Sequence, residues 1–146
     1  MANALAFFDI DADYDLMLHE LKMLAEQKNY EIYDDIDKSI NVFDIVKVRA
    51  RKYIEGQYVR SLTDPPIIIV LRDLEKDYVK WIFQSMTRAN LYIIVCVDKL
   101  TKITPEQKVN IEFIAYVAES HLKEPHVFII HKHTQDTYSS LSQVMK

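Results

Sequence analysis

Residues 65–97 read PPIIIVLRDLEKDYVKWIFQSMTRANLYIIVCV and decide the fold class. Residues 67–71 and 91–97 are continuous apolar runs, which are typical of strands buried on both faces of a sheet. Between them the apolar residues recur at helical spacing, and we expect a helix with Asp73 as its N-cap and Asn90 near its end. A strand, a helix and a strand joined by short links predict a parallel pair with a right-handed crossover.

The segment that follows extends this alternating pattern. Thr104-Pro105-Glu106-Gln107 forms a capping box with proline at the first helical position, so a helix is predicted from here to about Glu119. Pro125 then precedes an apolar run at residues 126–130, which we interpret as a third parallel strand. The predicted fold class is α/β, with a small, mostly parallel sheet and helices packed on it in a restriction-endonuclease-like three-layer arrangement.

The first part of the chain is mainly helical in its pattern. Apolar residues recur every three or four positions over residues 14–28 and again over residues 42–50, so each segment is predicted to form a helix. The acidic residues 30–37 are predicted to form a loop or a short extended piece. We expect one domain, 1–146, with a helical part (14–65), a β-α-β-α-β part (66–133) and a tail (134–146) that adds a short amphipathic helix through Tyr138.

Glycine and cysteine are each present once, as Gly56 and Cys96. Glycine-rich loops bring backbone N–H groups close to a phosphate and need several glycines, so the composition rules out oxidoreductases of the Rossmann kind and P-loop nucleotidases. A single cysteine builds neither a disulfide nor a cysteine-based zinc site. Within its apolar run, Cys96 is predicted to be a small buried hydrophobe. We expect no cofactor.

The formal net charge of −4 argues against wholesale electrostatic binding to nucleic acid. A local basic surface remains open as a phosphate-facing site, with an ordinary solvated helix face as the alternative. The apolar runs are far shorter than a membrane helix requires, so no membrane partner is expected. The predicted nucleic-acid-facing residues are Lys47, Arg49, Arg51, Lys52 and Arg60.

Histidines near the end of the chain offer a metal-site hypothesis. His131 and His133 lie two residues apart, so both rings would point to the same side of an extended segment, near His126 and Asp136. The alternative is a polar strand exit exposed to solvent, which we favour. We therefore predict no metal site.

Carboxylates offer a nuclease hypothesis. A restriction-type nuclease places an acid before one strand and an acid-x-lysine pair on the next, so that carboxylate oxygens converge on magnesium. Asp64 precedes the first predicted strand, but Glu75-Lys76 and Asp98-Lys99 lack the intervening residue. We predict no catalytic residues and no enzymatic activity.

The order of these features resembles the N-terminal jaw domain of the shared subunit five of eukaryotic RNA polymerases I, II and III. The likeness covers roughly residues 14–133, whereas the family's linker and C-terminal assembly domain have no counterpart after residue 133. The matching segments are residues 21–30, 67–70, 78–82, 92–95, 103–105 and 127–130.

This resemblance implies a non-catalytic subunit or domain of a DNA-directed RNA polymerase that shapes the downstream DNA cleft. The implied partners are other polymerase subunits, chiefly the largest, and downstream duplex DNA. The implied location is the nucleus for a cellular protein, or the cytoplasmic or nuclear replication site of the host cell for a viral one. A metal-dependent nuclease and a stand-alone protein-interaction module are the alternative functions.

Overall fold

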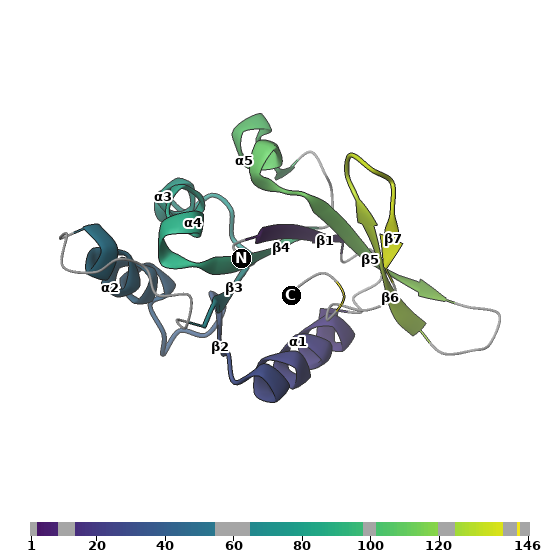
Figure 1. Ribbon diagram of the computed structural model, residues 1–146, viewed down its shortest axis with the longest axis horizontal. Coiled ribbons are helices and arrows are strands. Elements are labelled where there is room, and N and C mark those ends of the chain that lie inside the picture. The colour runs from purple at the N-terminus through teal and green to yellow at the C-terminus, as the bar shows by residue number, and fades with distance from the viewer. Residues whose placement is uncertain are drawn as a thin grey trace.

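The computed structural model describes residues 3–8, 14–54, 65–97, 102–119, 125–138 and 143. Within these ranges the strands form one seven-stranded sheet in the order β2-β3-β4-β1-β5-β6-β7 (Figure 1). The strands are β1 (Asn3–Phe8), β2 (Glu31–Asp34), β3 (Ile67–Leu71), β4 (Leu91–Val97), β5 (Phe113–Glu119), β6 (Pro125–His131) and β7 (Thr137–Tyr138). The helices are α1 (Tyr14–Lys28), α2 (Val42–Ile54), α3 (Tyr78–Gln84), α4 (Met86–Ala89) and α5 (Pro105–Asn110).

The first five strands are parallel, and only the last two reverse direction. β1 lies between β4 and β5 and pairs in parallel with both, while β2, β3 and β4 pair in parallel with one another. β6 pairs antiparallel with β5, and β7 antiparallel with β6. The prediction of an α/β fold with a mostly parallel sheet is therefore confirmed, and the carboxyl ends of β1 to β5 all meet at one edge of the sheet.

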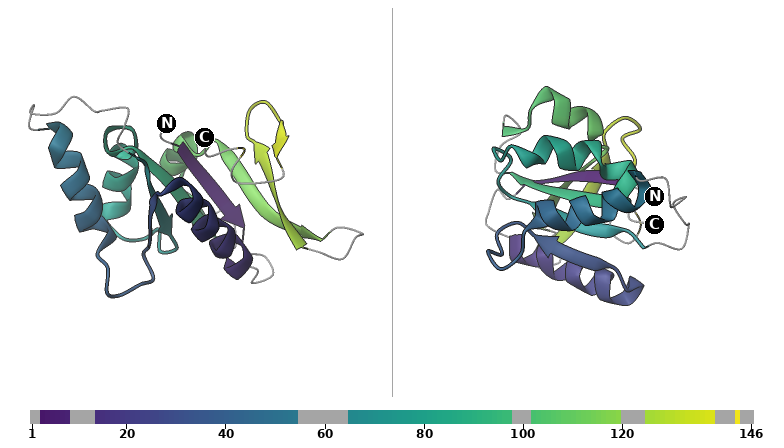
Figure 2. Two further views of the ribbon diagram at one scale, coloured as in Figure 1. Left: turned by 60° about the horizontal axis from the view of Figure 1, so that its bottom comes forward. Right: turned by 90° about the vertical axis from the view of Figure 1, so that its left-hand side faces the viewer.

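The helices cover both faces of the sheet (Figure 2). Helix α1 packs its Met17, Leu21 and Leu24 side chains on one face, and the other helices pack on the opposite face. The chain leaves β1 through α1 to reach β2, and then travels in the opposite direction across the sheet through β3 and β4 to β5. Because the two directions of travel use opposite faces, all of these crossovers have the same hand.

The centre of the sheet is apolar on both faces. Every residue of β3 and β4 is buried. Side chains alternate between the faces, so Ile69 and Ile93 lie in the core with α2, α3 and α4, whereas Ile68 and Ile94 lie in the core with α1. Continuous apolar runs are required here because neither face of these strands meets water.

The helices over residues 14–28 and 42–50 are confirmed as α1 and α2. The α3–α4 region confirms the helical spacing but begins later than expected. Asp73 does not cap it: the side chain accepts a hydrogen bond from the Glu75 N–H at 3.1 Å, and α3 starts at Tyr78. Asn90 does end α4, with φ of 56°, a left-handed conformation that asparagine tolerates.

The predicted helix to Glu119 is wrong beyond Asn110. The capping box forms as expected, with the Thr104 hydroxyl accepting from the Gln107 N–H and the Gln107 side chain accepting from the Thr104 N–H. The chain then extends at Ile111 and enters β5. Pairing of residues 113–116 with β1 and of the whole of β5 with β6 outweighs the helical spacing of this segment.

The third predicted strand exists as β6, but the three-stranded parallel arrangement is wrong. Because residues 113–119 form a strand rather than a helix, the chain returns antiparallel beside them. Ile130 is consequently half-buried rather than part of the core, with Thr137 of β7 beside it. The predicted tail helix is also wrong at Tyr138, which lies in β7.

Two strands were not assigned from the sequence. Residues 31–34, expected to be a loop or an extended piece, form the edge strand β2. Residues 3–8, for which no element was predicted, form the central strand β1, with Ala4, Leu5 and Ala6 buried.

Replacing Ile94 by alanine should lower the free energy of unfolding by about 2–5 kcal/mol, through lost transfer energy and the cavity left behind. Ile94 is 1% exposed, whereas Val109 on α5 is 77% exposed. Val109→Ala is the control and should change the stability by less than about 0.5 kcal/mol. Urea denaturation measures both, and an equally small effect of Ile94→Ala would contradict the central position of β4.

Candidate functional site

The topology identifies one edge of the sheet as the place for a ligand. The chain leaves β1 toward β2 on one side and leaves β4 toward β5 on the other, so the order reverses between these two neighbouring strands. In open α/β sheets, ligands bind outside the carboxyl ends of the strands at such a switch point. The end of β4 lies at this switch point and the residues after its other neighbour, β3, lie beside it at the same edge, so these are the candidates within the described part of the chain.

A pocket of about 370 Å³ lies at this edge. The segment after β3 supplies most of its wall, the end of β4 supplies the rest, and a lysine before α5 completes it. The side chains include two cations and two carboxylates, together with three apolar residues. The lining residues are Arg72, Asp73, Leu74, Glu75, Cys96, Val97 and Lys102.

Three charged side chains at the ends of β2 and β3 fix the backbone beside this pocket, and we call them the carboxylate clasp (Asp34, Asp35 and Arg72). One oxygen of Asp35 accepts hydrogen bonds from the backbone N–H groups of Arg72, at 2.8 Å, and Asp73, at 3.0 Å. The Arg72 guanidinium donates to Asp34 at 2.7 Å. All three side chains are half-buried. The clasp therefore ties the exit of β3 to the exit of β2.

The electrostatics of the clasp are dominated by burial. Loss of water raises the pKa of Asp35, and the nearby Asp34 carboxylate adds to this, while the two backbone N–H groups and the Arg72 charge act in the opposite direction. The second oxygen of Asp35 is buried without a hydrogen-bond partner. Burial also raises the pKa of Tyr78, with further contributions from the carboxylates of Asp35 and Asp73. This edge of the sheet thus holds a costly concentration of negative charge.

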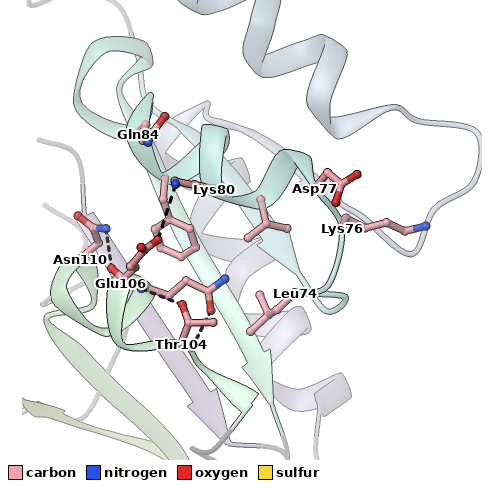
Figure 3. Close-up of a pocket in the computed structure, with 11 residues that line it drawn as sticks. Leu74, Lys76, Asp77, Lys80, Gln84, Thr104, Glu106 and Asn110 are labelled. Carbon is pink, nitrogen blue, oxygen red and sulfur yellow. Dashed lines mark hydrogen bonds and ion pairs between the residues drawn. The ribbon is translucent and has the colours of Figure 1, made fainter.

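A second pocket, of about 250 Å³, lies between α3 and α5 (Figure 3). The Lys80 ammonium and the Glu106 carboxylate point toward one another across it, 4.0 Å apart. Both side chains are largely exposed, so water screens this pair. Leu74 lines both the pocket between α3 and α5 and the pocket at the sheet edge, so the two pockets are neighbours.

The predicted basic surface on α2 is divided by the fold. Lys47 lies 3.6 Å from Asp44 and 4.9 Å above the ring of Phe43, and Arg51 is exposed. Arg49 instead donates to backbone carbonyls of Pro65, at 2.9 Å, and Ala89, at 3.3 Å.

The remaining two basic residues lie outside what the structure describes: Arg60 entirely, and Lys52 in its side chain. A nucleic-acid-facing role for the five residues stays a prediction.

The histidine segment forms a turn rather than a ligand cluster. His131 accepts, through Nδ1, hydrogen bonds from the N–H groups of His133, at 3.2 Å, and Thr134, at 3.1 Å. Its Nε2 lies 3.9 Å from a Glu112 carboxylate oxygen. The side chain of His126 is not among those described. Across the described residues, no three His, Cys, Asp or Glu side chains gather closely enough to hold a metal by themselves.

Of the acids that the nuclease hypothesis considered, only Glu75 is described at the sheet-edge pocket. Glu75 and Lys76 follow β3, and Glu75 lines the pocket at the sheet edge. Asp64 and the pair Asp98-Lys99 lie outside the described residues. Cys96 is buried, as predicted, and also contributes to the pocket wall.

Sequence reasoning missed Asp34, Asp35 and Arg72. A signal was present for Arg72 and Asp73, because polar residues that directly follow a doubly buried strand mark its exit from the sheet. No comparable signal exists for Asp35, because β2 is short and only half-buried.

Solved structures with a similar fold are nucleoside triphosphatases. The genome packaging NTPase B204 of Sulfolobus turreted icosahedral virus 2, determined with AMPPCP, aligns over 95% of this chain and 96% of its own, with a TM-score of 0.56 and 10% identity. EssC (ATPases 2 and 3) of Geobacillus thermodenitrificans aligns over 95% of this chain, with a TM-score of 0.55 and 13% identity, but this chain spans only 39% of its length. At such identities the similarity concerns the fold.

Comparisons at the level of sequence give no relatives. No protein-family model matches the chain, and no curated protein sequence matches it. Among the described residues, none of the helices has the length and apolar character needed to cross a bilayer.

These findings correct the polymerase interpretation. The fold is shared with the packaging NTPase and with EssC, so the resemblance to the RNA polymerase jaw domain and the inferred role as a transcription subunit are wrong. The nuclease alternative is likewise unsupported. The order of apolar strands and the Thr104-Pro105 helix start that carried the resemblance are features that any α/β sheet with a capped helix shares.

The expectation of a protein without enzymatic activity is corrected by the same finding, because the two structures named above are those of an NTPase and of ATPases. The single glycine is the ground on which the sequence rules out P-loop nucleotidases. It does not exclude a fold shared with NTPases. A glycine count tests one loop of such a protein, whereas the fold is specified by the buried strands and the helices that cover them.

Arg49→Ala should lower the free energy of unfolding by about 1–3 kcal/mol, because its two carbonyl partners lose a charged donor. The matched control is Arg51→Ala, because Arg51 lies two residues further along α2 and is exposed. Its free energy of unfolding should stay within about 0.5 kcal/mol of the wild-type value. Chemical denaturation of the two variants measures this. Equal effects would show that Arg49 is no more structural than its exposed neighbour.

Proposed function

We propose that the chain is a magnesium-dependent nucleoside triphosphatase that works at the pocket between the ends of β3 and β4. The observation that carries the proposal is the composition and place of this pocket. Two carboxylates, Asp73 and Glu75, and two cations, Arg72 and Lys102, line it at the carboxyl edge, beside the switch point of a sheet whose fold is shared with NTPases. Carboxylates together with cations are the groups that phosphoryl transfer uses.

The carboxylates suit magnesium. Mg²⁺ takes oxygen ligands and in nucleotide sites is commonly held by one or two carboxylates together with phosphate oxygens and water. Asp73 is the ligand that we assign, because its side chain is already oriented by the Glu75 N–H. When bound, the ion would offset negative charge on the phosphate oxygens. No third protein ligand is needed for such a site.

Glu75 is exposed and lines the same pocket, which suits it to accept the proton of an attacking water. Addition of that water to the terminal phosphorus breaks the bond to the leaving oxygen and yields a nucleoside diphosphate and inorganic phosphate.

The cations take the place of a phosphate loop in this proposal. Residues 9–13, between β1 and α1, read Asp-Ile-Asp-Ala-Asp and contain no glycine, lysine, serine or threonine. This composition cannot supply the lysine and the close backbone approach of a glycine-rich phosphate loop. Recognition of the phosphates is therefore assigned to Arg72 and Lys102, which line the pocket. The sharing of this fold with an NTPase determined with AMPPCP supports a nucleotide as the ligand.

The purified chain should bind AMPPCP in calorimetry only when magnesium is present, and should release phosphate from a nucleoside triphosphate. Glu75→Gln should reduce the release of phosphate by about 10²–10⁴-fold, because it removes the proton acceptor, and should leave AMPPCP binding in place. Asp73→Asn should weaken the magnesium-dependent part of binding.

The control is Glu106→Gln, an exposed carboxylate of the pocket between α3 and α5, which should behave as the wild type. Absence of AMPPCP binding at millimolar nucleotide and magnesium would overturn the proposal. So would equal phosphate release by the wild type and Glu75→Gln, because the activity would then not belong to this pocket.

A further inference from the structure

We propose that Asp35 is the positioning residue of the sheet-edge pocket: a single carboxylate oxygen, offered from the end of β2, holds the backbone after β3 so that Asp73 and Glu75 face the pocket. The expected effect on phosphate release rests on the proposed function, whereas the expected effect on the backbone amides of Arg72 and Asp73 does not. Nothing in the sequence pattern or in the comparisons assigns a role to this residue.

The geometry shows why the backbone after β3 needs such a residue. β2 and β3 pair in parallel up to Asp34 and Val70, and the Asp35 N–H still donates to the Val70 carbonyl at 3.0 Å. Beyond this point β2 ends, so on this side the N–H groups of Arg72 and Asp73 have no residue of β2 to pair with. The Asp35 side chain turns back and accepts from both at 2.8 and 3.0 Å. The carboxylate thus replaces the missing strand.

An ionised acceptor suits this position. Two donors converge on one oxygen, and hydrogen bonds to a carboxylate are shorter and stronger than those to a neutral oxygen. The neighbouring Asp34 strengthens the arrangement, because it holds the Arg72 guanidinium at 2.7 Å and accepts from the Ile36 N–H at 3.2 Å. The segment from residue 72 to residue 75 is therefore fixed at three points: by Asp35, by Asp34 and by the turn that Asp73 makes with the Glu75 N–H.

Several charged groups surround this carboxylate. The charged groups that face Asp35 are Asp34 on its own strand exit, Arg72 and Asp73 on the segment after β3, and the phenol of Tyr78 at the start of α3. Burial outweighs the favourable contacts and raises the pKa of Asp35 in the folded chain.

The test is amide hydrogen exchange by NMR on the full chain. In Asp35→Ala the amides of Arg72 and Asp73 should exchange about 10–100-fold faster than in the wild type, as loss of a charged hydrogen-bond acceptor implies. Asp35→Asn keeps one acceptor oxygen and should protect both amides partly, so it serves if the alanine variant folds poorly. Asp37→Ala is the matched control, because Asp37 also accepts from a nearby backbone N–H, that of Ser39, but makes no contact with the segment after β3.

The phosphate-release assay provides a second readout. Asp35→Ala should lower kcat/KM, because the segment that carries Arg72, Asp73 and Glu75 is misplaced, and Asp35→Asn, which keeps an acceptor oxygen, should restore part of it.

Unchanged exchange of both amides in Asp35→Ala and Asp35→Asn would overturn the inference. Faster exchange of these amides in a chain whose wild type lacks phosphate release would retain the positioning role and refute the proposed function instead. The two failures are therefore distinguishable.

Discussion

The structure depends on strands that are apolar on both faces. Every residue of β3 and β4 is buried, and β1 beside them places Ala4, Leu5 and Ala6 in the core. Such strands are stable only with a helical layer on each side, which fixes α1 on one face and the other helices on the opposite face. With both faces covered, polar chemistry is confined to the edges, and only at the carboxyl edge do two neighbouring strands send the chain in opposite directions. The place of the site thus follows from the core.

The carboxylate clasp shows how this fold supports charged groups at that edge. β2 is a short, half-buried edge strand that ends before β3 does, and the backbone beyond it would lack partners. Asp35 and Asp34 provide these partners, and Arg72 offsets part of their charge. An apolar side chain at position 35 would leave these two N–H groups without their acceptor and would not hold the segment that carries Asp73 and Glu75.

Sequence patterns predicted the structure correctly where burial alone or local capping alone determined it. Two long apolar runs could only be buried strands, and the capping box at Thr104 is local chemistry that needs no tertiary partner. The patterns failed where distant pairing decided the outcome. Residues 113–119 have apolar spacing that fits a helix face, and only β1 and β6, far away in sequence, make them a strand. The clasp was missed for the same reason, since Asp35 and Arg72 are 37 positions apart and meet only because β2 and β3 pair.

A crystal structure of the chain with magnesium and AMPPCP tests the central claim most directly, namely that the carboxyl edge of β3 and β4 is the functional site. The account predicts that the phosphates lie between Arg72 and Lys102, with the metal ion against Asp73 and the hydrogen bonds of Asp35 to the backbone intact. Nucleotide in the pocket between α3 and α5, or none at the sheet edge at a concentration that saturates binding in solution, would contradict it.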